Sequence, residues 1–186
     1  YDMPLLTRRQ TLLTGTAALG ALATPWIARE QGADDIVIGS SSPITGVFAN
    51  VGIDLNAAMQ HYTDWRNDQG GIEGRRLRFV WEDSAYRTNE SVAIFRKLMA
   101  QDNPQLYYGD STGWAKAVAA ELTQRATTMS SAPSFSSDLA DPENVPYYFM
   151  SAPTYEAMMG VLLRYIREQA GSDTPRVALI YSDTEF

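Results

Sequence analysis

Gly109 to Gly113 carry the pattern G-x-S-x-G, which places Ser111 where a serine hydrolase has its nucleophile. Such a Ser needs a His to take its proton, and in this class of hydrolase the His follows the Ser along the chain. The chain contains one His, His61, and it precedes Ser111. Hydrolysis would therefore need a base from outside this sequence. The alternative is that Ser111 or Thr112 caps the helix that follows.

Glu82 and Asp83 form a second candidate site, because two carboxylates at a strand end could act as a general base or hold a metal. No third ligand stands at suitable spacing, so a solvated or Arg-paired surface is the alternative. The chain has no Cys, which excludes thiolate catalysis and Cys-based metal sites. It also lacks a P-loop and a G-x-G-x-x-G motif. We therefore expect no metal, no nucleotide and no cofactor.

The composition is that of a globular protein, with 45% hydrophobic and 20% charged residues among 186. The formal net charge of −7 argues against nucleic acid and anionic membranes as partners, since both are bound by clustered Lys and Arg.

The first residues resemble a twin-arginine export signal. Arg8 and Arg9 precede a weakly apolar run that ends at 21–23, where small residues suit a signal peptidase. Thr11 stands where a Phe is common, and Asp2 dilutes the positive charge; an amphipathic N-terminal helix is the alternative. The run is too polar to span a membrane. We expect residues 1–34 to be an export signal with a linker, and the protein to be periplasmic.

From residue 35 onward, short apolar runs typical of buried strands alternate with stretches of helical periodicity. The expected strands are 36–39, 77–81, 106–108, 127–131, 147–150 and 177–181, and the expected helices are 53–67, 92–99, 115–122 and 155–169. This alternation predicts an α/β fold with a doubly wound, mostly parallel sheet.

Each of these helices carries apolar residues at helical spacing, which predicts one buried face, as the first and the last of them illustrate. The residues are Leu55, Ala58, Met59, Tyr62 and Trp65 in the first, and Met159, Leu162, Leu163 and Ile166 in the last. His61 lies beside the first stripe, where we expect a solvated residue rather than a ligand.

The stretch 105–116 is a strand that passes into a helix through Gly, Asp, Ser and Thr. In an open α/β sheet this is where ligands bind, because the strand end opens onto a crevice and the helix N-terminus presents unpaired N–H groups. The loop 132–138 is a second strand end of the same kind, small and polar with one aromatic residue.

Taken together and in this order, several segments resemble the periplasmic solute-binding proteins of the branched-chain amino acid and amide class, which serve ABC transporters. The segments are 36–39 with 42–46 and Gly52, 67–75, the pair Glu82-Asp83, 109–118, 131–139 and 177–186. The resemblance implies two α/β lobes that close on a ligand. Residues 35–151 would form the first lobe and 152–186 the start of a second, so that this chain would be an N-terminal fragment whose first lobe is completed by later segments.

The same resemblance implies that the ligand is held at Ser111, Thr112, Gly113, Trp114, Pro133 and Phe135. Gly113 and Phe135 stand where the amino acid binders commonly have a Ser and a Thr, which argues against a simple aliphatic amino acid as ligand. Trp114, Phe135 and Tyr155 could form an aromatic wall instead. The alternative for Trp114 is packing on the helix surface.

We therefore expect a monomeric, exported, non-enzymatic receptor that delivers a small polar organic solute to the permease of an ABC transporter. The solute would be an amino acid, an amide, urea or an aromatic acid. A cytoplasmic ligand sensor of the same fold and a serine hydrolase that uses Ser111 are the alternatives.

Overall fold

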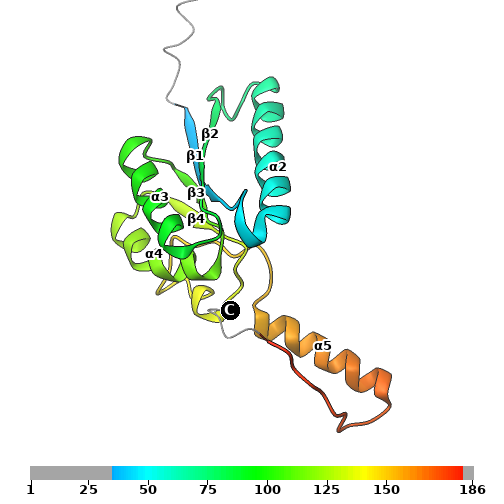
Figure 1. Cartoon of the computed structure of the whole chain (residues 1–186). Coiled ribbons are helices and arrows are strands. Elements are labelled where there is room, and N and C mark those ends of the chain that lie inside the picture. Colours follow the sequence, from blue (N-terminus) through cyan, green and yellow to red (C-terminus); the bar gives the residue numbers. More distant parts are fainter. Residues whose placement is uncertain (1–34, 182–186) are drawn as a thin grey trace, which may run out of the picture. The chain divides into compact units, whose positions relative to one another are not determined.

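The computed structural model describes residues 35–181, in which four parallel strands form one sheet between helices (Figure 1). The strands are β1 (Ile36–Ser42), β2 (Leu77–Asp83), β3 (Leu106–Tyr108) and β4 (Met129–Ser131), in the spatial order β2-β1-β3-β4. The helices are α2 (Ala49–Asp68), α3 (Thr88–Gln101), α4 (Thr112–Arg125) and α5 (Tyr155–Ala170), with short 3-10 turns at η1 (Gly46–Phe48) and η2 (Ser137–Leu139). The predicted α/β fold with a parallel sheet is confirmed.

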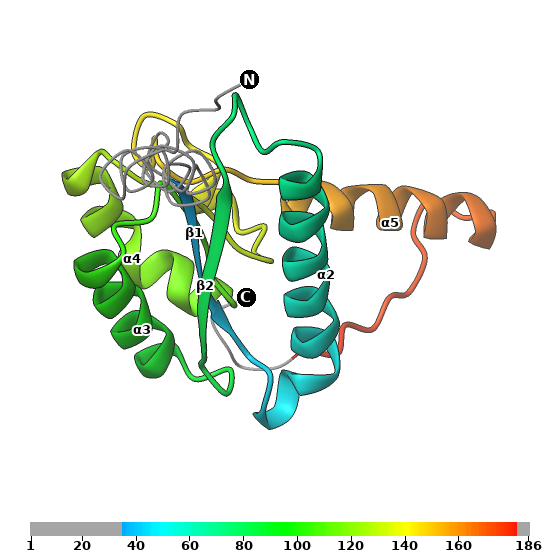
Figure 2. The ribbon, with the colours of Figure 1, turned by 90° about the horizontal axis from the view of Figure 1, so that it is seen from above.

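The connections α2, α3 and α4 each join one strand to the next and lie on the two faces of the sheet. Figure 2 shows α3 and α4 on one face and α2 on the other. β1 is central and pairs with β2 over its whole length, from Ile36 opposite Leu77 to Ser42 opposite Asp83. It therefore extends beyond the predicted 36–39, because Ser40, Ser41 and Ser42 still find ladder partners.

The core lies between the sheet and the helix pair α3 and α4. Its buried side chains are Ile94, Phe95, Leu98, Met99, Tyr107, Trp114, Ala115, Val118, Leu122, Ala132, Leu139 and Tyr148. Three of them form an aromatic cluster, in which Trp114 stacks on Tyr107 with ring centroids 5.2 Å apart and Phe95 meets Trp114 edge-on at 5.8 Å. Offset-stacked and edge-on contacts are the favourable geometries for aromatic rings.

Gly109, between β3 and α4, is required by this cluster. A Cβ atom added there would lie 1.9 Å from Cε3 of Trp114, far inside van der Waals contact. The absence of a side chain at Gly109 therefore lets the Trp114 ring lie against the strand end, and the entry of the chain into α4 depends on it.

The α2 face is packed less completely, and the predicted apolar stripe of α2 is wrong in part. Tyr62 and Trp65 are 58% and 55% exposed, and the residues that α2 does bury are Gly52 and Thr63. Beside α2 the sheet borders an apolar hollow of about 430 Å³, whose lining includes Leu106 and Phe149. No described helix covers this part of the sheet, so the stripe has little surface to pack against.

Two predicted strands do not form. Tyr148, in 147–150, makes a single bridge to Ser130, whose backbone bonds Tyr147 and Phe149, and the pairing extends no further. Residues 177–181 have no strand partner among the described residues and are exposed, with Ile180 at 97%. A strand needs a neighbour to bond its backbone, so the apolar run alone does not make one.

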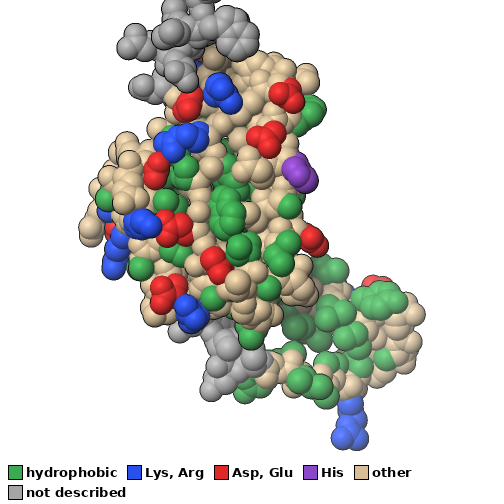
Figure 3. All heavy atoms as spheres, turned by 45° about the horizontal axis from the view of Figure 1, so that its top comes forward, with side chains coloured by type: hydrophobic (Ala, Val, Ile, Leu, Met, Phe, Trp, Pro, Cys, Tyr) green, Lys and Arg blue, Asp and Glu red, His purple; other side chains and the backbone are tan. Residues whose placement is uncertain are grey.

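The helix α5 forms as predicted, but none of its residues is buried, so its predicted buried face is not observed. Figure 3 shows hydrophobic side chains gathered on the surface of this C-terminal part. The predicted export signal, 1–34, lies outside the described residues. Within residues 35–181, no helix combines the length and the apolar character needed to cross a bilayer.

Candidate ligand-binding site

The loops that follow the four strands meet at one edge of the sheet, because the strands are parallel. They are 43–48 after β1, 84–87 after β2, 109–111 after β3 and 132–136 after β4. Ligands of open α/β proteins bind outside this carboxyl edge. All the predicted first-lobe contacts, 111–114 and 133–135, belong to these loops or to the first turn of α4.

Ser111 is the N-cap of α4. Its backbone is extended, and its Oγ accepts a hydrogen bond of 3.2 Å from the N–H of Trp114. Its hydroxyl donates to Oδ1 of Asp110 at 2.8 Å. The predicted capping role of Ser111 is thus confirmed. The G-x-S-x-G match is explained by this cap, since the Ser proton is directed to a carboxylate and the single His, His61, is exposed on α2.

Asp110 is a buried acidic residue that sequence analysis did not single out. Its side chain is only 2% exposed. Besides Ser111, it accepts hydrogen bonds from the hydroxyls of Ser84, at 2.5 Å, and Ser91. Asp110 thus joins the loop after β2, the first turn of α3 and the N-cap of α4. Three hydroxyl donors satisfy a buried carboxylate without an ion pair.

Asp83 performs a different task at the end of β2. It accepts the N–H groups of Ile44 at 3.1 Å and Thr45 at 3.2 Å, and the hydroxyl of Thr45 at 2.5 Å. Partial desolvation raises the pKa of Asp83, but hydrogen bonds from Thr45, Ala85 and Ile44 together hold it below the usual value. Its neighbour Glu82 pairs with Lys97 at 2.6 Å. Asp83 therefore fixes the loop after β1, whereas Glu82 joins β2 to α3 through a Lys rather than the expected Arg.

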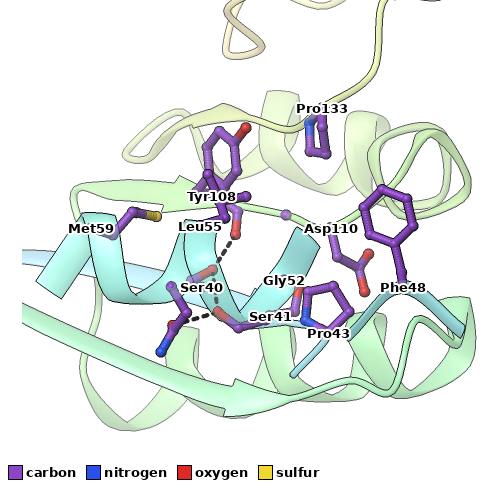
Figure 4. Close-up of a pocket in the computed structure, with 13 residues that line it drawn as sticks. Ser40, Ser41, Pro43, Phe48, Gly52, Leu55, Met59, Tyr108, Asp110 and Pro133 are labelled. Carbon is purple, nitrogen blue, oxygen red and sulfur yellow. Dashed lines mark hydrogen bonds between the residues drawn. The ribbon is translucent and has the colours of Figure 1, made fainter. Parts of the chain in front are cut away.

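A small cavity lies between the N-terminus of α2 and the ends of β1 and β3 (Figure 4). Its volume is about 10 Å³, which is room for about one water molecule. Polar groups line one side, where hydrogen bonds link Asn56, Ser42, Ser40 and the carbonyl of Tyr108. Pro133 and Asp110 border it from the loops after β4 and β3, and Phe48 from the loop after β1.

The predicted aromatic wall is wrong for Trp114. Its ring has no exposed surface and lies in the core, so it cannot contact a ligand in the crevice. The spacing already carried this signal, because Trp114 and Val118 are four residues apart on one face of α4. Phe135 and Tyr155 do meet, edge-on at 5.7 Å, and both are half-buried. Their role toward a ligand stays a prediction.

A second aromatic pair escaped the sequence analysis. Phe48, after β1, stacks on Tyr86, after β2, with ring centroids 4.6 Å apart. Ala85 and Tyr86 both have positive φ, at 49° and 58°, a strained conformation for residues with side chains. Such strain is concentrated at functional sites. Nothing in the spacing of Phe48 and Tyr86 indicates that they meet.

The remaining predicted contacts lie at the start of α4. Thr112 is buried, with no hydrogen bond recorded for its hydroxyl among the described residues. A Cβ added at Gly113 would lie 2.7 Å from Oγ1 of Thr88, so a Ser there would collide with the start of α3. The N–H groups of Thr112 and Gly113 have no acceptor within the helix, because the first turn has none. These two N–H groups are therefore the hydrogen-bond donors that the N-terminus of α4 can offer to a ligand.

The loop after β4 is held by Tyr148. Its hydroxyl donates to the carbonyl of Ser134 at 3.1 Å. Burial raises the pKa of Tyr148 to about 12, so the hydroxyl keeps its proton at neutral pH and stays a donor. Within residues 35–181 no group of His, Asp or Glu is placed to hold a metal ion.

A family model described as "Periplasmic binding protein" matches residues 35–186. Among curated proteins no significant match is found. The chain is similar in structure to a substrate-binding periplasmic protein from Ralstonia solanacearum, with 26% identity and a TM-score of 0.60 over 70% of this chain and 38% of that one.

Two further solved structures share the fold. One is a fatty acid ABC transporter substrate-binding protein from Thermomonospora curvata, with 21% identity and a TM-score of 0.67, covering 74% of this chain and 34% of that one. The other is a branched chain amino acid ABC transporter from Thermus thermophilus with bound valine, with 21% identity and a TM-score of 0.65, covering 74% and 35%. The matched part is thus between 34% and 38% of the length of these three proteins.

Proposed function

The chain belongs to the periplasmic binding protein family, and we propose on that premise that it forms the first ligand-binding lobe of an exported receptor. The receptor binds a small organic solute and delivers it to the permease of an ABC transporter. This family consists of binding proteins rather than enzymes, in agreement with the non-enzymatic prediction.

The observation that carries the proposal is the convergence of four strand-end loops on the N-terminus of α4. Ser111 caps this helix, and the first-turn N–H groups of Thr112 and Gly113 remain available as donors. Phe135 and Tyr155 supply apolar surface nearby. A crevice with a few oriented polar groups beside aromatic rings is the usual make-up of a small-molecule site.

The hollow beside α2 is much larger than the cavity at the strand ends, yet we do not assign the solute to it. Apart from two serines, its lining consists of hydrophobic residues from the sheet and α2, together with Phe149. Such a surface offers few polar groups that could orient a polar solute. We propose instead that the hollow is covered by later segments of the full-length protein, which return to the first lobe.

The division into lobes is also part of the proposal. Residues 35–151 form the first lobe, and 152–186 begin the second. Support comes from the contrast in packing, since α5 buries no residue while α3 and α4 enclose a core. Further support comes from the length of the structural neighbours, of which this chain covers about a third.

The class of solute and the route of export complete the proposal. Structural neighbours are named for fatty acids and for branched-chain amino acids, so the fold alone does not select a solute. We propose a small organic molecule with polar groups, namely an amino acid, an amide, urea or an aromatic acid. Export by the twin-arginine route rests on the sequence of residues 1–34 alone.

A thermal-shift screen of the full-length protein tests the proposal, because a ligand that binds the folded state raises the melting temperature. We expect one class of solute to raise it and Ser111→Ala to reduce the shift. Thr123→Ala is the matched control, since Thr123 lies near the other end of α4 and bonds only within the helix. No shift with any solute class would contradict the proposed receptor.

A cytoplasmic sensor of the same fold is separated from the exported receptor by localisation. The proposal predicts that the full-length protein is exported and that Arg8→Lys together with Arg9→Lys blocks export. Retention of the wild-type protein in the cytoplasm would favour the sensor.

A further inference from the structure

We propose that the contacts between residues 135–137 and 155–156, which we call the clasp, hold the start of α5 in one orientation relative to the first lobe. Ser137 and Glu156 are then positioning residues for solute binding, because they act through the orientation of α5 and not by touching the solute. This inference rests on the proposed receptor function and on its division into lobes.

Packing does not fix the orientation of α5. None of the residues of α5 is buried, whereas α3 and α4 lie against the core. A helix is usually held in a protein by the burial of one apolar face. The orientation of α5 must therefore come from contacts of another kind.

The first turn of α5 is joined to the loop after β4 by such contacts. The N–H of Tyr155 donates to the carbonyl of Phe135 at 2.8 Å, and the two rings meet edge-on at 5.7 Å. This carbonyl satisfies one of the N–H groups that a helix leaves without an internal acceptor. The hydroxyl of Ser137 donates to Oε1 of Glu156 at 2.8 Å. That bond is the largest of the effects that hold the pKa of Glu156 below its usual value, so Glu156 is an ionised acceptor at neutral pH.

The turn η2, which carries Ser137, is itself fixed to the first lobe. Its last residue, Leu139, is 3% exposed and belongs to the core. Asp138 pairs with Lys116 of α4 at 3.0 Å and accepts a hydrogen bond from the hydroxyl of Ser136. The bond from Ser136 and then that from Lys116 hold the pKa of Asp138 below its usual value. The clasp therefore connects α5 to a part of the chain that the core and α4 hold in place.

The clasp also brings Phe135 and Tyr155 together, and both are predicted solute contacts. An orientation of α5 without the clasp would separate the two rings. The apparent affinity for a solute falls in proportion to the fraction of molecules in the binding-competent orientation. Stabilising this orientation through Ser137 and Glu156 therefore strengthens binding at a site that these two residues do not form.

Amide hydrogen exchange, followed by NMR in the full-length protein, tests the clasp without a solute. In Ser137→Ala, we expect the protection of the Tyr155 amide to fall about threefold, because the loss of one bond raises the fraction of molecules in which the clasp is open. The amide of Ala157 is the internal control, since it bonds to Thr154 within the same helix cap, and its protection should not change. Ser137→Thr keeps the hydroxyl and should recover most of the lost protection.

Solute affinity provides the second test. Leucine, acetamide, urea and benzoate represent the proposed solute classes, and calorimetry on the full-length protein gives the dissociation constant of the probe that binds most tightly. Ser137→Ala and Glu156→Ala should each raise it about threefold. The double variant should be no weaker than either single variant, because both remove the same bond. Glu168→Ala, an exposed position near the other end of α5, is the matched control and should bind like wild type.

The possible results separate the clasp from the receptor. Unchanged Tyr155 protection in Ser137→Ala would overturn the clasp and leave the receptor intact. A double variant whose loss of affinity is the sum of the two single losses would also overturn it, since the two residues would then act independently. If none of the four probes binds and the wider solute screen is silent, the proposed function fails, and the protection of Tyr155 still decides whether the clasp exists.

Discussion

The two faces of the sheet differ in how completely they are covered. On one face, α3 and α4 enclose a cluster in which Phe95 and Trp114 have no exposed surface. On the other face, Trp65 is more than half exposed and an apolar hollow of about 430 Å³ lies against β3 and β4. The packed face holds the loops of the carboxyl edge in place, and the open face has surface for a further element.

This difference separates two kinds of apolar surface. The aromatic residues of the α3 and α4 face form the core against the sheet and position α4, whose first turn belongs to the proposed solute site. The aromatic residues at the carboxyl edge, such as Phe48 and Tyr86, contact each other across two loops and remain partly exposed. By its size alone, the hollow on the open face would be chosen as the solute site. The polar groups that could orient a solute lie instead at the carboxyl edge of the sheet.

The largest expected effect is that of Trp114→Ala on the packed face. Removing a fully buried Trp side chain leaves a cavity, so the free energy of unfolding should fall by about 3–5 kcal/mol. Chemical denaturation of this chain measures it. Trp65→Ala on α2 is the matched control and should cost less than about 1 kcal/mol, because this side chain is 55% exposed. Equal losses of unfolding free energy in the two variants would mean that the two faces of the sheet are packed alike in solution. That result would contradict the difference between the faces.

Gly109→Ala should have the next largest effect. The added Cβ would lie 1.9 Å from the Trp114 ring, and relief requires the backbone or the ring to move. Overpacking of this kind costs about 1–3 kcal/mol, measured again by denaturation. Gly160→Ala on α5, where an added Cβ meets nothing within 4 Å, is the control and should be neutral or slightly stabilising. A neutral Gly109→Ala would show that the Trp114 ring is not held against the strand end.

Glu121→Gln should have the smallest effect. Glu121 on α4 accepts hydrogen bonds from Arg96 of α3, at 3.0 Å, and from Arg125. Partial desolvation raises the pKa of Glu121, but these two Arg residues together lower it below its usual value of 4.5. A lowered pKa in the folded state stabilises the protein above the unfolded value and loses this effect as the pH falls through the folded value.

The free energy of unfolding at pH 7 should fall by about 0.5 kcal/mol on Glu121→Gln, because the side chains of both Arg partners are exposed to solvent, at 61% and 39%. The difference between wild type and variant should shrink as the pH drops below 4.5. Denaturation curves at several pH values measure it. A difference that is independent of pH would show that packing, rather than charge, accounts for the loss.

The sequence predicted the elements that depend on local signals. Strand β3, the Ser111 cap and α4 follow one another within a few residues, and each has a signature in the order of apolar and small polar residues. The two strands that were wrongly predicted, 147–150 and 177–181, have the right composition but lack the partners that a strand needs. Composition describes a strand's side chains and not its neighbours.

The candidate site was predictable only in part. Ser111, Pro133 and Phe135 lie at the strand ends, as expected of parallel strands. Asp110 was missed because its partners Ser84 and Ser91 are 26 and 19 residues away, and no spacing rule connects them. Trp114 was misinterpreted because its place in the first turn after a strand end favoured the crevice, although its four-residue spacing from Val118 already indicated the core face of α4.

Amide hydrogen exchange of the full-length protein, with and without the solute that gives the largest thermal shift, tests the central claim most directly. If the solute binds at the carboxyl edge, exchange should slow at Thr112, Gly113 and the loop 133–135. Exchange at Met129 and Phe149, which line the hollow beside α2, should stay unchanged. Protection confined to the hollow, with Thr112 and Gly113 unaffected, would contradict the account.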